Sequence, residues 1–262
     1  MKRFFLLIVF LSVTCQVGFA QGFCDINNFA FQNGEQLKYK VYYNVSFMYI
    51  GAGEVTFSTA LTTFRNHPAW HVVGKGRTFS SYDWVFKVRD QYESYIDTAT
   101  MLPLHFIRDV HEGSYSKYNK VDFYHDKQAA VSRNGTYKIP ACAQDVISAI
   151  YFARNIDFDK YNKGDRIPFN MFLDDEVYNI YIRYMGKETV TTHYGTFHAI
   201  VFKPLLIKGT IFEGGEKMKV WVSDDLNRIP LRVNSPITVG SIKVDMMGYK
   251  NLRHPLSSLI KR

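Results

Sequence analysis

The sequence predicts an all-β protein built on one large antiparallel meander sheet, with a single packed α-helix. Apolar and polar side chains alternate along many short segments, as they do in half-buried strands. Turn-forming residues separate these segments at short, regular intervals. Aromatic residues, which suit a pleated surface, make up 16% of the chain, with 18 Tyr and 21 Phe.

Alternation is clearest from Glu35 to Val45, where Leu37 and every second residue after it are apolar. The same period returns from Val55 to Leu61, after a Gly51-Ala52-Gly53 corner that permits a bulge or a tight reversal. Further strands are predicted at residues 70–79, 85–96, 104–111, 115–125, 129–133, 166–173, 176–186, 188–193, 196–206, 218–223, 229–233 and 240–249.

One segment breaks the strand rhythm and predicts a helix over about residues 143–155. Asp145 stands where an N-cap would accept backbone N–H bonds. The apolar residues at helical spacing, expected to face the concavity of the sheet, are Val146, Ala149, Ile150 and Ala153. No linker rich in Pro, Gly or Ser divides the chain, so residues 21–262 are expected to form one domain.

The N-terminus has the pattern of a secretory signal peptide over residues 1–20. A positive start at Lys2 and Arg3 precedes an apolar run over residues 4–13, and small residues end the segment at Ala20. The run is shorter than the roughly 18 residues of a spanning helix. We therefore expect export after cleavage at Ala20. Lipidation at Cys15 is the less favoured alternative, because the residues before it fit a lipid-attachment signal poorly.

Two cysteines remain once Cys15 is removed with the signal peptide. In an exported protein an even pair indicates a disulfide, so Cys24 and Cys142 are predicted to be bonded. A metal site is the alternative, but Cys24 has no second ligand nearby in sequence, and the eight His show no ligand spacing.

Charge and motifs argue against several functional classes. The 32 Lys and Arg exceed the 24 Asp and Glu, but they are scattered, so no nucleic-acid partner is expected. No Gly-x-Ser-x-Gly elbow occurs, and the glycine-rich segments lead into strands. The acidic run Asp174-Asp175-Glu176 is interpreted as a turn. We therefore expect no catalytic residue, no metal and no cofactor.

Several stretches, taken together, resemble a family of exported bacterial proteins known as domain of unknown function 3108. They are Phe31-Gln32-Asn33-Gly34-Glu35-Gln36-Leu37-Lys38-Tyr39, Gly51-Ala52-Gly53, Gln144 to Tyr151 with Arg154, Val220 to Asp225, and Arg228-Ile229-Pro230. The resemblance implies a meander sheet curled into a half-barrel or open barrel around a helix, similar to periplasmic lipoprotein carriers. It implies no activity and no catalytic residues.

The favoured function is therefore a non-enzymatic binding or scaffold protein of the Gram-negative periplasm or outer-membrane surface. An apolar, aromatic groove near the helix would hold a lipid, an acyl chain or an envelope glycan, with membrane association peripheral at most. The alternatives are an outer-membrane β-barrel, which alternating strands and many aromatics also suit, and a periplasmic enzyme of unknown class.

Overall fold

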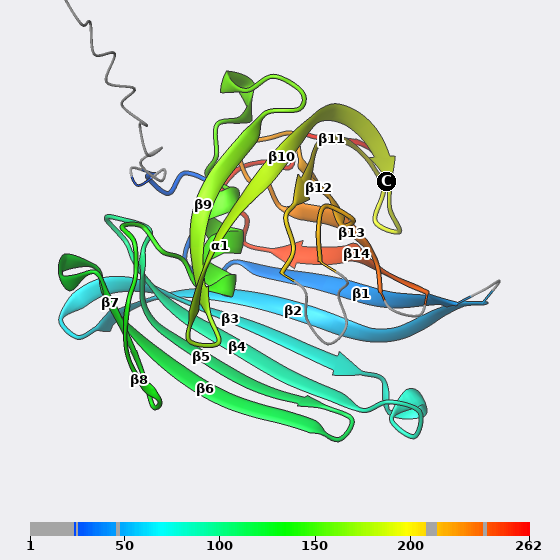
Figure 1. The fold of residues 1–262 in the computed structure, drawn as a ribbon. Helices are drawn as coiled ribbons and strands as arrows, with labels where there is room; N and C mark the ends of the chain where they lie inside the picture. Colours follow the sequence, from blue (N-terminus) through cyan, green and yellow to red (C-terminus); the bar gives the residue numbers. More distant parts are fainter. Residues whose placement is uncertain (1–23, 25, 46–47, 208–213, 238–239) are drawn as a thin grey trace, which may run out of the picture.

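The computed structural model describes residues 24, 26–45, 48–207, 214–237 and 240–262. The predicted signal peptide and Cys15 lie outside these residues. Within them the chain forms an open, curled antiparallel sheet around one α-helix (Figure 1), which confirms the predicted fold class.

The sheet contains 15 strands within the described residues. Those before the helix are β1 Gln36–Val45, β2 Met48–Phe64, β3 His67–Thr78, β4 Val88–Asp97, β5 Pro103–Glu112, β6 Tyr115–Tyr124, β7 Ala129–Ser132 and β8 Gly135–Lys138. Those after it are β9 Arg166–Leu173, β10 Glu176–Thr191, β11 Thr196–Pro204, β12 Lys219–Ser223, β13 Pro230–Pro236, β14 Ser241–Lys250 and β15 Leu259–Lys261. The helices are α1 Val146–Ala153 and the 3-10 segments η1 Ser80–Tyr82, η2 His125–Lys127 and η3 Phe158–Lys160.

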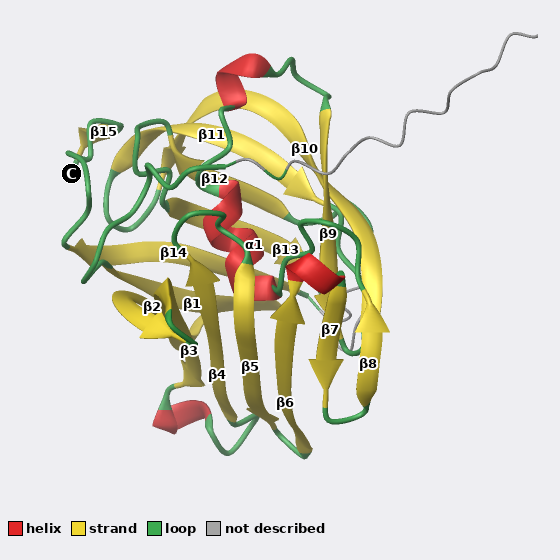
Figure 2. Cartoon of the chain, turned by 90° about the vertical axis from the view of Figure 1, so that its left-hand side faces the viewer, coloured by secondary structure: helices red, strands yellow, loops and turns green. Residues whose placement is uncertain are grey.

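Two meanders share this sheet. Strands β1 to β8 run outward from β1, strands β14 to β9 run outward from β14, and β1 pairs with β14 at the centre. The edges β8 and β9 are therefore neighbours in sequence but lie at opposite ends of the strand order. The connection between them carries α1, which contacts β4 and β9 and lies within the curl of the sheet (Figure 2).

Two predicted strand boundaries lie within longer strands, at bulges; at Gly51-Ala52-Gly53 the bulge was one of the two alternatives expected. Gly51-Ala52-Gly53 lies inside β2, where Ala52 is the extra residue opposite Val41 and Tyr42 of β1. Gly186 likewise lies inside β10, with φ of 93° at a register shift, so the two strands expected over residues 176–193 are one. A bulge bends a strand and increases its twist, which helps a long strand to curl.

The short strands β8 and β15 were not predicted. Each has only three or four residues, too few to show an alternating pattern. β15 pairs with β11, outside the main strand order, so the C-terminal segment is held on the sheet.

The apolar interior consists of three clusters. The first joins the helix to β9–β12 and includes Phe152, Phe158, Phe169, Ile182 and Phe202. The second joins it to β3–β7 and includes Phe31, Val72, Phe106, Ile147 and Tyr151. The third joins β1 to β11–β14 and includes Leu37, Tyr39, Phe197, Trp221 and Met246.

In the described part of the chain, no helix has both the length and the apolar character needed to cross a membrane.

Candidate functional site: the helix within the curled sheet

A capping box fixes the start of α1. Asp145 Oδ1 accepts the backbone N–H groups of Ile147 and Ser148, both at 2.8 Å, and the Ser148 hydroxyl accepts the Asp145 N–H at 2.8 Å. Asp145 Oδ2 accepts the Ser94 hydroxyl of β4 at 2.6 Å, which ties the helix start to the sheet. Burial raises the pKa of Asp145 to about 6, against these hydrogen bonds, which favour the carboxylate.

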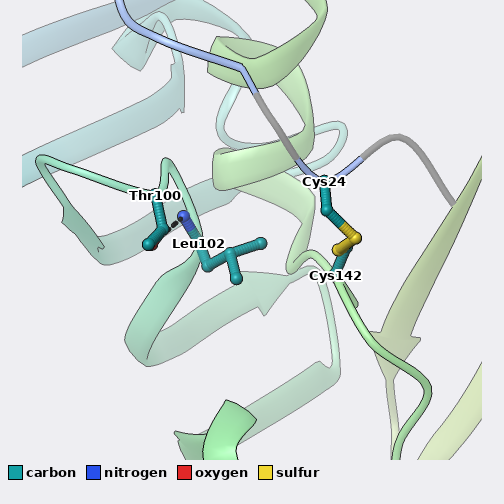
Figure 3. Close-up of a disulfide and its surroundings, with 4 residues drawn as sticks. All are labelled: Cys24, Thr100, Leu102 and Cys142. Atoms are coloured by element: carbon teal, nitrogen blue, oxygen red, sulfur yellow. Dashed lines mark hydrogen bonds between the residues drawn. A yellow bond between two sulfur atoms is a disulfide. The ribbon is translucent and has the colours of Figure 1, made fainter.

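The segment before the cap is held by β9 and by a covalent link. Gln144 pairs in parallel with β9: its N–H donates to Asn170 O and its carbonyl accepts the Phe172 N–H, both at 2.8 Å. A disulfide joins Cys142 to Cys24, with their Cα atoms 5.3 Å apart (Figure 3). The N-terminal segment is thus attached three residues before the N-cap.

A buried ion pair anchors the other end of α1. Arg154, the C-cap, contacts Glu35 through two hydrogen bonds, Nη1 to Oε1 at 2.6 Å and Nη2 to Oε2 at 2.8 Å. Their side chains are 2% and 0% exposed. Burial disfavours the charged form of Arg154, but the Glu35 carboxylate outweighs this and raises its pKa. The Arg154 guanidinium therefore stays charged inside the protein.

Other polar groups complete this network. Arg154 Nε donates to the Asn227 carbonyl at 3.1 Å, and the Asn227 side chain donates to the His254 carbonyl at 3.0 Å. Asn155 Oδ1 accepts the Ala30 N–H at 3.1 Å, and Arg228 donates to the carbonyl of Ile156. The residues Glu35, Arg154, Asn155, Asn227 and Arg228 are called the Arg154 hub below. They join the N-terminal segment, β1, the helix end, the β12–β13 turn and the C-terminal segment.

The hub brings together motif residues that the sequence showed only as separate stretches. Glu35 belongs to the first motif, Arg154 to the helix motif and Arg228 to the last. Sequence reasoning assigned them no role. The sequence offered one signal for this role: a charged residue, Arg154, directly follows an eight-residue helix in which only Ser148 is polar. A charge beside such an apolar helix is buried only together with a partner, so Arg154 could have been expected to pair with an acidic residue.

The helix is buried most deeply on a side that we did not predict. Its buried residues are Ile147, Ser148, Tyr151 and Phe152. A Cβ at Gly74 of β3 would lie 2.9 Å from the Phe57 ring, so glycine leaves room for this ring, and Ile147 Cδ1 lies just beyond it at 3.4 Å. α1 is also shorter than residues 143–155. Its nearly uniform apolar character explains the error, because periodicity cannot select one face of such a helix.

The four residues predicted to face the concavity are Val146, Ala149, Ile150 and Ala153, called the helix stripe below. All four are half-buried. Ala149 and Ala153 pack against the first cluster, Ile150 packs against the second, and Val146 packs against both. The helix stripe therefore lies at the junction of the two clusters and keeps part of its apolar surface accessible.

Half-buried apolar side chains from both meanders pack against the same two clusters. They include Phe57, Trp70 and Tyr92 from β2–β4, and Val177, Tyr178, Leu205 and Val233 from β10–β13 and the connection after β11. Four of these seven are aromatic. Apolar and aromatic surface thus remains accessible on both halves of the sheet.

Among the buried polar groups near the helix are two side chains that have no hydrogen-bond partner within the described residues. One is the side-chain amide of Gln144, at both Nε2 and Oε1, and the other is the Tyr39 hydroxyl. Gln144 is fully buried and is paired with Met171, a member of the first cluster. Burial also raises the pKa of Tyr39, so its hydroxyl stays protonated. Both groups can bond a polar atom that enters this region.

A cleft of about 400 Å³ lies on the face of β2–β5 that points away from α1. Its lining is mainly polar and charged: Glu54, Thr56, Lys75, Gly76, Arg77, Arg89, Asp90, Gln91, Asp109 and His111. It therefore differs in place and chemistry from the apolar groove expected near the helix. Across the described residues, no three His, Cys, Asp or Glu side chains are grouped so as to hold a metal ion.

One solved structure supports this architecture. A β-barrel-like protein of domain of unknown function DUF1849 from Brucella abortus has a similar fold, with a TM-score of 0.57 and 8% identity over 85% of this chain and 99% of that one. A candidate lipoprotein from Parabacteroides distasonis gives a TM-score of 0.40 and 12% identity over 86% and 100% of the two chains. No curated protein matches. The family model described as "Protein of unknown function (DUF3108)" matches residues 38–247, and the chain belongs to this family.

Proposed function

We propose that this protein is an exported, non-enzymatic binding protein that holds an acyl chain of a lipid or lipoprotein against the helix stripe. The observation that carries the proposal is a helix that is apolar on nearly all sides and yet only half-buried on one of them. An all-apolar helix is ordinarily buried on every side, so its accessible side favours an apolar ligand.

The surroundings of the helix stripe favour an acyl chain over a glycan. The half-buried side chains near it are aliphatic and aromatic, and such a lining suits an apolar chain better than a sugar. The unpartnered Gln144 amide can bond the polar end of such a ligand. Export follows from the signal-peptide pattern and is part of the proposal.

Filling the accessible side of the helix tests the proposal. We expect Ala149→Trp to weaken binding of a fluorescent palmitic-acid analogue at least about ten-fold, because the indole would occupy the ligand's place. Ala60→Trp, at an exposed alanine of β2, is the matched control and should leave binding unchanged. Both variants are first checked for native β content by circular dichroism.

The native ligand can be identified independently by mass spectrometry of lipids and glycans that co-purify with the exported protein. We expect one acyl-chain class in the wild type and its loss in Ala149→Trp. Equal binding by the wild type and Ala149→Trp, or a glycan as the sole co-purified molecule, would contradict the proposal.

A further inference from the structure

An exposed apolar segment stands in the loop between β3 and β4, far from the helix stripe in the sequence. Trp84, Val85 and Phe86 are 85%, 63% and 49% exposed. They are consecutive, and Trp84 has the largest exposed fraction among the described large hydrophobic residues of the chain. Single exposed apolar residues are common, but a contiguous run indicates a contact surface.

The loop is held in one conformation although its apolar side chains are exposed. The Trp84 indole N–H donates to Ser81 O at 3.0 Å, and the Val85 N–H donates to Tyr82 O at 2.9 Å. Asp83 accepts the Thr78 hydroxyl at 2.7 Å and pairs with Arg89 at 2.6 Å. A loop ordered in this way loses little conformational entropy when it binds.

A neighbouring strand and a neighbouring hairpin end contact this loop. The Phe79 N–H donates to Ala52 O of β2, and the Gly113 N–H of the β5–β6 turn donates to Lys87 O. The β3–β4 loop therefore lies beside β2 and the β5–β6 hairpin and projects from the end of the sheet (Figure 1). Tyr115, which is 42% exposed, belongs to the β5–β6 hairpin.

The charges of the loop suit an anionic surface. Arg89 neutralises Asp83, the acidic residue between η1 and β4, and Lys87 is exposed directly after Phe86. Aromatic side chains with adjacent lysines are typical of segments that bind the headgroup region of a bilayer.

We propose that the β3–β4 loop docks this protein on the surface of an anionic lipid bilayer, with Trp84, Val85 and Phe86 entering the interface. A projecting loop tip suits a bilayer because a fluid surface needs no matching cavity. Lys87 then lies at the level of the lipid phosphates, where one cation strengthens binding. The inference goes beyond the proposed acyl-chain binding and does not require it.

Tryptophan fluorescence of the exported protein tests the docking directly, because Trp70 is half-buried and Trp221 is buried. With vesicles of phosphatidylethanolamine and phosphatidylglycerol, we expect the emission to shift to shorter wavelength and to be quenched by brominated lipid. Trp84→Phe should abolish both changes while vesicle co-sedimentation persists.

Two triple variants test whether vesicle binding depends on the loop itself or on exposed apolar residues anywhere on the surface. Trp84→Ser with Val85→Ser and Phe86→Ser should reduce the vesicle-bound fraction at least about ten-fold, since most of the buried apolar area is lost. Leu61→Ser with Tyr118→Ser and Leu226→Ser removes three other exposed apolar residues, 53%, 50% and 56% exposed, and should bind as the wild type does. Lys87→Ala should weaken binding about five-fold on anionic vesicles and have little effect on phosphatidylcholine.

Ala149→Trp keeps this inference distinct from the acyl-chain proposal, because that variant is expected to co-sediment with vesicles as the wild type does. Unchanged emission of the wild type with anionic vesicles, or equal co-sedimentation of the two triple variants, would overturn the bilayer proposal.

Discussion

The two ends of α1 are anchored in different ways. At the start, Asp145 caps the helix through residues two and three positions later, and a disulfide lies just before it. At the end, Arg154 depends on Glu35 and Asn227, which are 119 and 73 residues away in sequence. The hydrogen bonds that cap the helix start therefore come from neighbouring residues, although Ser94 and Cys24 also hold this end from a distance. The side-chain hydrogen bonds of Arg154 at the other end all reach distant residues.

This difference has an energetic consequence. Each capping bond contributes modestly, and loss of one leaves a helix end that the disulfide still holds in place. Removal of either ion-pair partner leaves the other fully buried without its opposite charge. We therefore expect the protein to be more sensitive to substitutions at the end of α1 than at its start.

Breaking the Arg154 hub should have the largest effect. Arg154→Met leaves the Glu35 carboxylate buried and unpaired, so the free energy of unfolding should fall by about 3 to 5 kcal/mol in urea denaturation. The exposed pair between Arg77 and Glu54 is the control, and Arg77→Ala should cost less than about 1 kcal/mol. A similar small loss for Arg154→Met would show that the hub does not hold the helix end.

Removing the disulfide should come next. Cys142→Ser opens a loop of 118 residues, and we expect a loss of about 2 to 5 kcal/mol with unchanged β content by circular dichroism. Cys24→Ser should behave identically, because either change breaks the same bond. Two reactive thiols in the denatured, unreduced protein would contradict the pairing.

Truncations on opposite sides of α1 measure how unevenly the helix is buried. Ile147 is 3% exposed, so Ile147→Ala should cost about 2 to 5 kcal/mol. Ile150 is half-buried, and Ile150→Ala should cost only about 1 to 2 kcal/mol. Equal losses of stability for the two variants, in thermal or urea unfolding, would mean that the helix stripe is buried as deeply as the side that carries Ile147.

The pH dependence of the cap gives an effect smaller than those of the hub and the disulfide. Because the pKa of Asp145 is about 6 in the folded protein and near 3.8 when exposed, unfolding releases a proton between these values. Stability from this group is therefore greatest below about pH 4 and is lost as pH rises toward 6, by about 1 to 3 kcal/mol.

Asp145→Asn keeps a good N-cap and removes the titration. The difference in unfolding free energy between the wild type and this variant should consequently change between pH 4 and pH 7. Asp90, whose pKa burial also raises to about 6, lies in β4 away from the cap, so Asp90→Asn is the control for a second titrating group. If the stabilities of the wild type and of Asp145→Asn change in parallel with pH, the pH dependence does not come from Asp145.

Local features of the sequence predicted most of the strands and the site of the helix. Alternation located β1 to within a residue of its bounds, and Asp145 marked the N-cap. Turn signals were less reliable, because glycine serves bulges as well as reversals. The Gly51-Ala52-Gly53 segment and Gly186 both looked like strand ends and are bends within long strands.

The sequence by itself determined an all-β chain with one apolar helix, because side-chain alternation and capping depend on residues close together along the chain. It did not determine the pairing of β1 with β14, the choice of the deep side of α1, or the Arg154 hub. Only the tertiary structure decided these, since each depends on residues that folding brings together from distant parts of the chain. Because the helix is apolar on almost every side, its sequence pattern does not indicate which side the sheet will cover.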